Sequence, residues 1–336
     1  MKRALALVLV LVLTLTMFAG CGQKAAVKAN VTYGMVTDVG GLGDKSFNDS
    51  AWEGLKRAEK EFGVEPKILQ STKQEDYEAN LGNMAQSVDL TIAVGFLFEN
   101  AMKAVADQYP DKKFGVIDTV ADKANVMSVL FKEHEGSFLV GVIAGLTTKS
   151  NVIGFVGGME IPVIEKFEAG FIAGVKSVNP NAQVLVDYTG DFGKADLGKE
   201  VALKQFAQNA DVIFHASGAC GIGVIQAADE KGFWAIGVDQ DQAKESKNNK
   251  VLCSMIKRVD TGTYTITKAL VENKFEGGKV MTLGLKEEGV GYSDGGKNVP
   301  AEISKKADAY KKSIIEGKIV VPATRAELAN FKPVQP

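Results

Sequence analysis

The chain has 336 residues, of which 46% are hydrophobic and 24% charged, with 39 basic and 41 acidic side chains. This length predicts two domains of about 150 residues each. Near-neutral charge argues against a nucleic-acid partner, which would require a clustered basic surface. The two histidines, His134 and His215, lie far apart in the sequence, so a histidine-rich zinc site is excluded. We expect a globular protein with no metal and no cofactor.

The N-terminus has the pattern of an export signal. Lys2 and Arg3 precede an uncharged apolar run that is too short for a comfortable membrane-spanning helix. The run ends in Phe18-Ala19-Gly20-Cys21, small residues before a cysteine, which looks like a bacterial lipobox. We predict a lipoprotein signal peptide over residues 1–20, lipidation at Cys21 and a polar tether over 21–30. Ordinary signal cleavage, with Cys21 a bystander, is the alternative.

Lipidation would determine where the protein resides. Acyl chains such as palmitate contribute about 0.8 kcal/mol per buried CH₂, so several chains on Cys21 would hold the protein stably on a lipid membrane. The expected location is the extracytoplasmic face of the cell membrane. Export would also permit a disulfide between Cys220 and Cys253. Two buried, unpaired thiols are favoured, but the sequence leaves this pairing open.

Apolar runs typical of strands alternate with segments of helical periodicity. Residues 31–37 are predicted as a strand and 46–62 as a helix that ends at Gly63, with Ser46 and Asp49 as a capping box. Further strands are predicted at 67–70, 90–94, 113–117, 126–131, 152–156, 183–187, 212–214, 234–238 and 251–256, and further helices at 162–178, 194–208 and 221–231. This alternation restarts after Ser150. It therefore predicts an α/β fold with two Rossmann-like, doubly wound lobes and a cleft between them.

Unusual residues lie at the carboxyl ends of the predicted strands, where such folds bind ligands. Aspartates follow four strands, and two phenylalanines and a lysine lie on adjoining segments: Asp38, Asp118, Asp191, Asp239, Phe47, Phe192 and Lys257. Packing into the core is the alternative for each phenylalanine, and exposure to solvent is the alternative for the lysine. If the fold is right, these residues converge on one cleft.

Motifs of common enzymes are incomplete. Asp44 separates Gly43 from Lys45, which breaks the phosphate-loop spacing, and the second histidine of a zincin is missing after His134. Asp239 and Asp241 could bind a metal as in some sugar transferases, but no third ligand lies near them in the sequence. The Gly-x-Ser-x-Gly elbow of hydrolases is absent. The sequence therefore predicts a protein without catalytic residues.

Several segments together resemble one family. They are Thr37-Asp38, Asp44-Lys45-Ser46-Phe47-Asn48, Ile117-Asp118, Val152 to Gly158, Phe167 to Phe171, Thr189-Gly190-x-Phe192, Gly237-Val238-Asp239-x-Asp241-Gln242 and Ser254-Met255-x-Lys257-Arg258. Together these segments resemble the basic membrane protein family of bacterial lipoproteins, which includes purine nucleoside receptors of ABC transporters. The resemblance covers essentially the whole mature chain.

The resemblance implies the type I periplasmic-binding-protein fold, with three segments crossing a hinge. Lobe 1 would then comprise residues 31–132 plus about 256–281, and lobe 2 residues 133–255 plus about 282–330. The expected protein is a monomer that passes its ligand to an ABC transporter permease.

The resemblance also assigns roles within the cleft. Phe47 and Phe192 match the residues that stack on a purine, and Asp118 matches the one that contacts the base. The remaining expected ligand-binding residues are the ribose contacts Asp38, Asp239 and Lys257, and the supporting polar residues Ser46 and Asn48. The expected ligands are purine nucleosides: guanosine, inosine and adenosine.

The residue chemistry supports this reading independently of the family. Stacking on an aromatic ring contributes about 1–3 kcal/mol per base, and a carboxylate can accept both hydroxyls of a ribose diol. Two alternatives stay open: the same fold could bind a sugar or a signalling molecule, or the chain could be an exported nucleoside hydrolase that uses Asp239 and Asp241. A surface antigen or adhesin is a third class.

Overall fold

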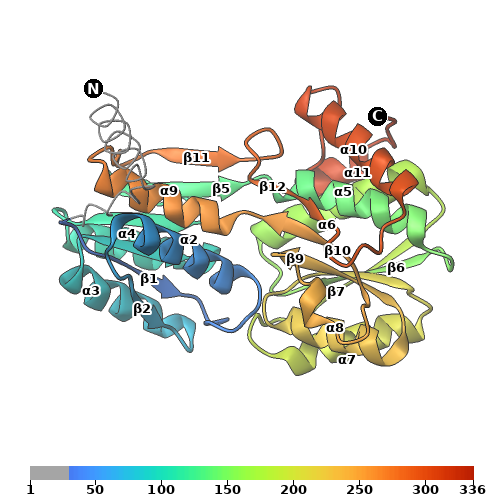
Figure 1. Ribbon diagram of the computed structural model, residues 1–336, viewed down its shortest axis with the longest axis horizontal. Helices are drawn as coiled ribbons and strands as arrows, with labels where there is room; N and C mark the ends of the chain where they lie inside the picture. The colour runs from blue at the N-terminus through green and yellow to red at the C-terminus, as the bar shows by residue number, and fades with distance from the viewer. Residues whose placement is uncertain (1–29) are drawn as a thin grey trace, which may run out of the picture.

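The computed structural model describes residues 30–336, so the predicted signal peptide and Cys21 lie outside the described part of the chain. Two α/β lobes lie side by side (Figure 1). Within the described residues, no helix has the length and apolarity that a membrane crossing requires.

Lobe 1 is built on a six-stranded sheet of order β11-β5-β4-β3-β1-β2, in which all neighbours are parallel. Its strands are β1 (Tyr33–Thr37), β2 (Lys67–Gln70), β3 (Leu90–Val94), β4 (Lys113–Ile117), β5 (Val126–Phe131) and β11 (Val280–Leu283). Its helices are α2 (Phe47–Phe62), α3 (Tyr77–Ser87), α4 (Glu99–Gln108) and α9 (Val259–Val271). Strands β1 and β3 are fully buried, as expected when helices cover both faces of a parallel sheet.

Lobe 2 repeats this plan with the order β12-β10-β9-β8-β6-β7. Its strands are β6 (Val152–Gly157), β7 (Gln183–Tyr188), β8 (Val212–Ala216), β9 (Trp234–Asp239), β10 (Val251–Lys257) and β12 (Val290–Ser293), the last antiparallel to β10. Its helices are α5 (Glu133–Thr147), α6 (Pro162–Val178), α7 (Ala195–Ala207), α8 (Cys220–Lys231), α10 (Ala301–Ile315) and α11 (Arg325–Asn330).

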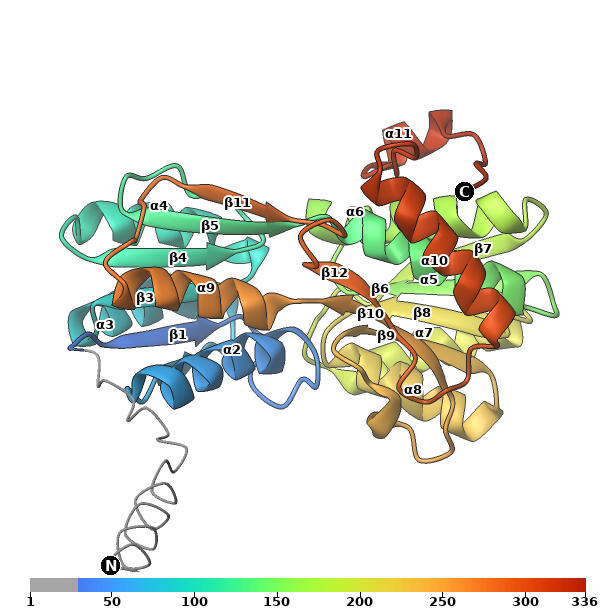
Figure 2. The ribbon, with the colours of Figure 1, turned by 45° about the horizontal axis from the view of Figure 1, so that its top comes forward.

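The strand order fixes where each lobe can bind a ligand. In lobe 1 the chain reverses its winding between β1 and β3, and in lobe 2 between β6 and β8. The carboxyl ends of the strands beside such a reversal open a crevice, because the loops leave toward opposite faces of the sheet. Figure 2 shows the two sheets end to end, with segments crossing between them, so the crevices meet at the lobe interface.

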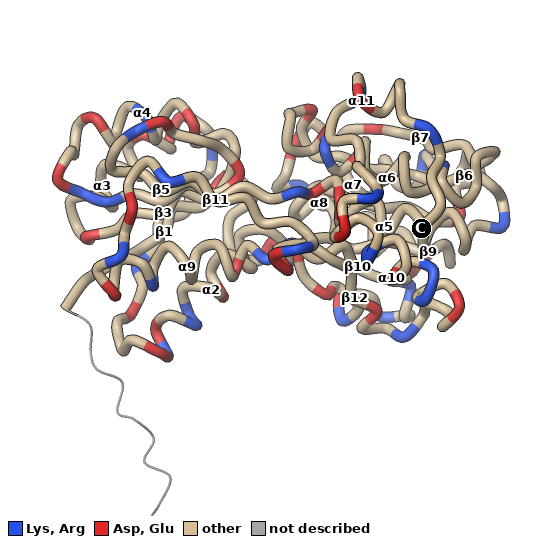
Figure 3. The backbone as a smooth tube through the Cα atoms, turned by 90° about the horizontal axis from the view of Figure 1, so that it is seen from above, with Lys and Arg blue, Asp and Glu red and all other residues tan. Residues whose placement is uncertain are grey.

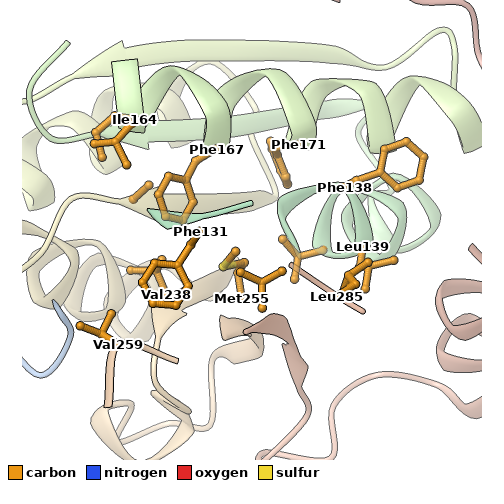
Figure 4. Close-up of a cluster of buried hydrophobic side chains, with 14 of the residues drawn as sticks. Phe131, Phe138, Leu139, Ile164, Phe167, Phe171, Val238, Met255, Val259 and Leu285 are labelled. Carbon is orange, nitrogen blue, oxygen red and sulfur yellow. The ribbon is translucent and has the colours of Figure 1, made fainter. Parts of the chain in front are cut away.

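The chain crosses between the lobes three times: from β5 to α5, from β10 to α9, and from β11 to β12. These crossings form the narrow waist of the molecule, and charged residues of both signs are spread over both lobes (Figure 3). One buried hydrophobic cluster continues through this region from lobe 1 to lobe 2. Ile164 and Phe167 project from α6 toward Phe131 and Val238 (Figure 4). The crossings are therefore packed against a common core.

The predicted fold class is confirmed, and most predicted elements are present within one or two residues of their expected ends. Gly63 ends α2 in the left-handed conformation, with φ of 69°. The predicted capping box is wrong: the Ser46 side chain makes no hydrogen bond to the first turn of α2. Its hydroxyl donates instead to Asp239 of the other lobe. Cys220 and Cys253 are both buried and free, so they form no disulfide.

Candidate ligand-binding site

A pocket that is partly open to solvent lies between the lobes. It is lined by the carboxyl ends of strands and the loops that follow them in both sheets. Of the predicted ligand-binding residues, the pocket lining includes Asp38, Phe47, Asn48, Asp118, Phe192, Asp239 and Lys257. Ser46 lies behind this lining and reaches the site through its bond to Asp239. The structure thus brings together residues that span more than half of the sequence.

Asp44 organises the lobe 1 loop that leads into α2. Its buried carboxylate accepts hydrogen bonds from the backbone amides of Ser46 at 2.9 Å, Asn48 at 2.8 Å and Asp49 at 3.1 Å. These are unpaired amides at a helix N-terminus, which an acidic side chain satisfies well. Asp44 therefore performs the capping role that the sequence reading gave to Ser46, and the Ser46 hydroxyl is left available for the cleft.

Asp38 is held by the same loop. Its Oδ1 accepts from the amide of Gly40 at 2.9 Å and from the Asn48 side chain at 2.7 Å. Burial raises the pKa of Asp38 to about 6, although these two hydrogen bonds oppose the shift. The carboxylate is thus oriented in advance at the edge of the pocket.

Asp118 and Asp239 occupy equivalent places in the two lobes, one directly after β4 and the other at the end of β9. Both have left-handed backbone conformations, with φ of 71° and 63°. This region is unusual for residues other than glycine, and such backbone strain is concentrated at functional sites. Burial raises the pKa of Asp239 to about 7, with Lys257 and Ser46 opposing the shift.

A buried chain of alternating charges runs from the pocket into the hinge. The Lys257 ammonium lies 2.6 Å from Asp118 Oδ2 and 3.1 Å from Glu133 Oε1, and Lys166 lies 3.2 Å from Glu133 Oε2. Burial raises the pKa of Asp118, against the pull of Lys257. Burial alone would lower the pKa of Lys257, but the carboxylates around it raise that pKa above its ordinary value. Lys257 is therefore a charged counterion at the floor of the site.

Aromatic rings surround this lysine. Its Nζ lies 5.0 Å from the ring centroid of Phe47, 5.2 Å from that of Phe131 and 5.5 Å from that of Phe167. A cation near a ring face is attracted to the ring's negative quadrupole, and more strongly where water is excluded. The Phe47 ring therefore lies beside Lys257. The ring is half-buried and lines the pocket.

On the lobe 2 side, the Phe192 ring packs directly on the backbone of Gly158. A Cβ built on that glycine would lie only 2.2 Å from Phe192 Cε1, so a larger residue would displace the ring. The Phe192 carbonyl also accepts from the amide of Ala219 at 2.9 Å. The loop therefore fixes the ring at the pocket edge, where Phe192 is partly buried against the core.

Several polar atoms at the site lack a hydrogen-bond partner within the described chain although they are buried: Asp118 Oδ1, Asn48 Oδ1 and Ser217 Oγ. Native proteins rarely leave such atoms unpaired, because the desolvation penalty is large.

Asp191, the remaining strand-end aspartate, pairs instead with Lys194 at 2.8 Å and does not line the pocket.

Sequence reasoning missed the apolar wall and Glu133. The wall comprises Phe96, Leu97, Ile161, Val163, Ile164 and Phe167. Phe96 follows β3 and Ile161 follows β6, so the strand-end rule that found the aspartates would also have found these residues. Glu133 lies at the first crossing, and only the tertiary structure places it beside Lys257.

Residues 30–336 contain no cluster of three or more His, Cys, Asp or Glu side chains that could hold a metal ion. The Asp241 carboxylate is occupied by the amide of Ala243 at 3.0 Å and by the Ser293 hydroxyl. Asp239 and Asp241 thus have separate partners.

Comparison with known proteins agrees with this architecture. The model of the family described as Bmp, ABC transporter substrate-binding protein PnrA-like, matches residues 31–325. The chain belongs to this family. Members of the Bmp family are binding proteins that work with ABC transporters, so a small-molecule ligand and a permease partner follow from membership.

Individual Bmp relatives cover most of the chain. A CD4+ T-cell-stimulating antigen of Listeria monocytogenes is 42% identical over 87% of this chain and 88% of its own length. The ABC transporter nucleoside-binding protein BmpA of Lactococcus lactis is 36% identical over 96% of this chain and 99% of its own. The crystal structure of a solute-binding protein from Aeropyrum pernix superposes with a TM-score of 0.79 at 30% identity, covering 89% and 96% of the two chains.

Proposed function

We propose that the interlobe cleft binds a purine nucleoside and that a lipid on Cys21 holds the protein at the extracytoplasmic face of the membrane. One observation carries the ligand proposal. Phe47 from lobe 1 and Phe192 from lobe 2 line the same pocket as the carboxylates of Asp38, Asp118 and Asp239. Two aromatic residues on separate lobes suit a flat heterocycle with two π faces.

The base is assigned to the part of the pocket near Asp118. Its Oδ2 pairs with Lys257 at 2.6 Å, whereas its Oδ1 is buried and has no hydrogen-bond partner in the described chain. A carboxylate oxygen accepts but does not donate. It therefore suits the N1–H and 2-amino donors of guanosine or the N1–H of inosine, whereas adenosine presents a bare acceptor at N1.

The ribose is assigned to Asp38 and Asp239, one carboxylate from each lobe. A vicinal diol supplies two donors, and charge-assisted bonds to a carboxylate are stronger than neutral ones. Among the described residues that line the pocket, Lys257 is the one cation, and Asp118 and Glu133 already neutralise it. A phosphate would meet uncompensated negative charge, so nucleosides are preferred over nucleotides.

Titration of ligand-stripped protein with the four ribonucleosides tests this proposal. We expect affinity in the order guanosine ≥ inosine > adenosine, with pyrimidine nucleosides weakest because they offer less surface to stack. Mass spectrometry of the denatured protein would identify any co-purified nucleoside. Adenosine binding as tightly as guanosine would remove Asp118 from the base edge, and preferential binding of a free sugar would support the sugar-binding alternative.

Incubation with inosine separates binding from hydrolysis. The Asp241 carboxylate is occupied by Ala243 and Ser293, which argues against a hydrolytic pair with Asp239. We expect no free base to accumulate. Release of hypoxanthine at a rate that depends on protein concentration would contradict a purely binding function.

We further propose that the lobes, bounded as predicted from the sequence, bend about the three crossings when ligand binds. Trp52 of α2 borders a groove whose other wall comes from residues 240–245 of lobe 2. Closure would change the surroundings of its indole. We therefore expect saturating nucleoside to shift Trp emission and to reduce the radius of gyration in solution. If neither changes, hinge closure is wrong.

A further inference from the structure

The segment Asp239-Gln240-Asp241-Gln242 begins at the last residue of β9, and the pocket lining includes only this first residue. The two glutamines point to the other lobe. Gln240 Nε2 donates to the carbonyl of Ser46 at 3.0 Å, and Gln242 Nε2 donates to the carbonyl of Lys45 at 2.8 Å. Two alternate side chains of lobe 2 thus bind two consecutive carbonyls of lobe 1.

The orientation of the Gln242 amide is determined by its neighbours. Its Oε1 lies 2.9 Å from the backbone amide of Val238 and 2.9 Å from His215 Nε2. The backbone amide can only donate, so the oxygen must face it and the Nε2 group must face Lys45. His215 then donates through Nε2. Gln242 is buried, and its backbone amide donates to Ser254 Oγ at 3.0 Å. The donor is therefore preset within lobe 2.

The acceptors on lobe 1 are equally constrained. The Asp44 carboxylate accepts from the backbone amides of Ser46 and Asn48. The amide of Lys45 donates to Asp49 at 3.1 Å. Lys45 itself is in the left-handed region, with φ of 55°, a conformation that costs a lysine backbone energy. The surrounding hydrogen bonds maintain this conformation, which aims both carbonyls at lobe 2.

We propose that Gln240 and Gln242 form an amide latch, positioning residues that hold the cleft closed without contacting the ligand. The latch bonds join opposite lobes, so they exist only when the lobes are together, and they slow opening and ligand release. This inference rests on the proposed function for its ligand, but the latch itself is formed by protein atoms alone.

Two variants test the latch. Gln240→Ala removes an amide whose hydrogen-bond partner in the described chain is the Ser46 carbonyl. Gln242→Glu keeps one oxygen for Val238 and His215 but sets the other against the Lys45 carbonyl. The matched control is Gln208→Ala, because Gln208 is exposed and its side-chain amide donates to the Lys204 carbonyl of the preceding helix. Melting curves identify any variant that loses stability, and Gln240→Ala is expected to melt like wild type.

The first measurement is the dissociation rate of guanosine, followed by a chase with excess unlabelled ligand. A net hydrogen bond is worth roughly a 2- to 10-fold change in an equilibrium. We expect Gln240→Ala to release guanosine roughly 2- to 10-fold faster, Gln242→Glu to release it faster still, and the association rate to change little. Unchanged dissociation in both variants would overturn the latch.

The second measurement is independent of the ligand. The latch is expected to keep a fraction of ligand-free wild-type molecules closed, and saturating nucleoside closes the remainder. Small-angle scattering of ligand-stripped protein should therefore give a larger radius of gyration for Gln242→Glu than for wild type and Gln208→Ala. If wild type binds none of the four ribonucleosides, the proposed function fails, and this scattering comparison still decides the latch. Identical curves for wild type and Gln242→Glu would then overturn it.

Discussion

The Lys257 ammonium lies 2.6 Å from Asp118 Oδ2 and joins the last residue of β10 in lobe 2 to the end of β4 in lobe 1. Both side chains are buried, with exposed fractions of 2% and 5%. The pair therefore links the two lobes at the floor of the cleft, and its partner Glu133 extends the link to the first hinge crossing.

Lys257→Met should destabilise the protein by about 3–5 kcal/mol at neutral pH, because it leaves Asp118 and Glu133 buried without their cation. Burial already raises the pKa of Asp118, whereas Lys257 and Lys166 outweigh burial and hold the pKa of Glu133 below its ordinary value. Removing Lys257 raises the pKa of both acids, so the loss of stability should shrink as the pH falls and they become protonated. Denaturant melts at pH 5 and pH 8 measure this. Lys166→Met, which removes a more exposed partner of Glu133, should cost less. Equal losses at both pH values would contradict this account.

Phe47→Ala and Phe192→Ala should each weaken nucleoside binding by about 1–3 kcal/mol if each ring stacks on the base. Calorimetric titration measures the affinity, and a melting curve of the same sample measures stability. Phe206→Ala is the matched control, because Phe206 stacks on Phe233 at a centroid distance of 5.5 Å and does not line the pocket. A variant that loses stability but keeps its affinity would place that ring in the core alone.

Asp239→Asn should lower affinity for ribonucleosides by about 1.5–3 kcal/mol, the value of a hydrogen bond to a charged group. The wild-type protein should lose a similar amount when offered the 2′-deoxynucleoside. The variant should discriminate less between the two sugars, because the group that recognises the diol is weakened. Equal wild-type binding of deoxy- and ribonucleosides would show that Asp38 and Asp239 do not hold the diol.

Affinity should fall as the pH drops below about 7. Burial raises the pKa of Asp38 to about 6 and that of Asp239 to about 7, both above their unfolded values. Each contributes stability to the ligand-free fold below its unfolded pKa, and this stability is lost as the pH rises through its folded pKa. A diol that donates to the carboxylates favours their ionised forms, so binding near pH 6.5 should release protons.

Calorimetry in two buffers of different ionisation enthalpy measures that proton release directly. We expect weaker nucleoside binding at pH 5.5 than at pH 8. Asp38 and Asp239 should also raise the melting temperature of the ligand-free protein on the acid side of neutrality. The double variant Asp38→Asn/Asp239→Asn should lose most of the pH dependence of nucleoside affinity. Binding that is constant over this range, without proton exchange, would contradict ribose recognition by the two carboxylates.

The sequence by itself determined most of the strands, four of the helices (α2, α6, α7 and α8) and the residues at the strand ends. Alternating apolar runs and helical periodicity are local signals, and parallel strands place their carboxyl ends at one edge. Asp38, Asp118 and Asp239 could therefore be assigned to a cleft without coordinates. β11 and β12 were not found, because they are short, partly exposed strands that pair with residues far away in the sequence.

Only the tertiary structure decided which partner each polar group has. Ser46 has the sequence of a helix cap, yet Asp44 caps α2 and the Ser46 hydroxyl binds Asp239 across the cleft. Glu133, Lys257 and Gln242 likewise have partners in other elements or the opposite lobe. Hydrogen bonds and buried ion pairs depend on distances of about 3 Å between groups distant in sequence. Local patterns carry no such information, so the charge network and the latch could be recognised only once the two lobes were placed together.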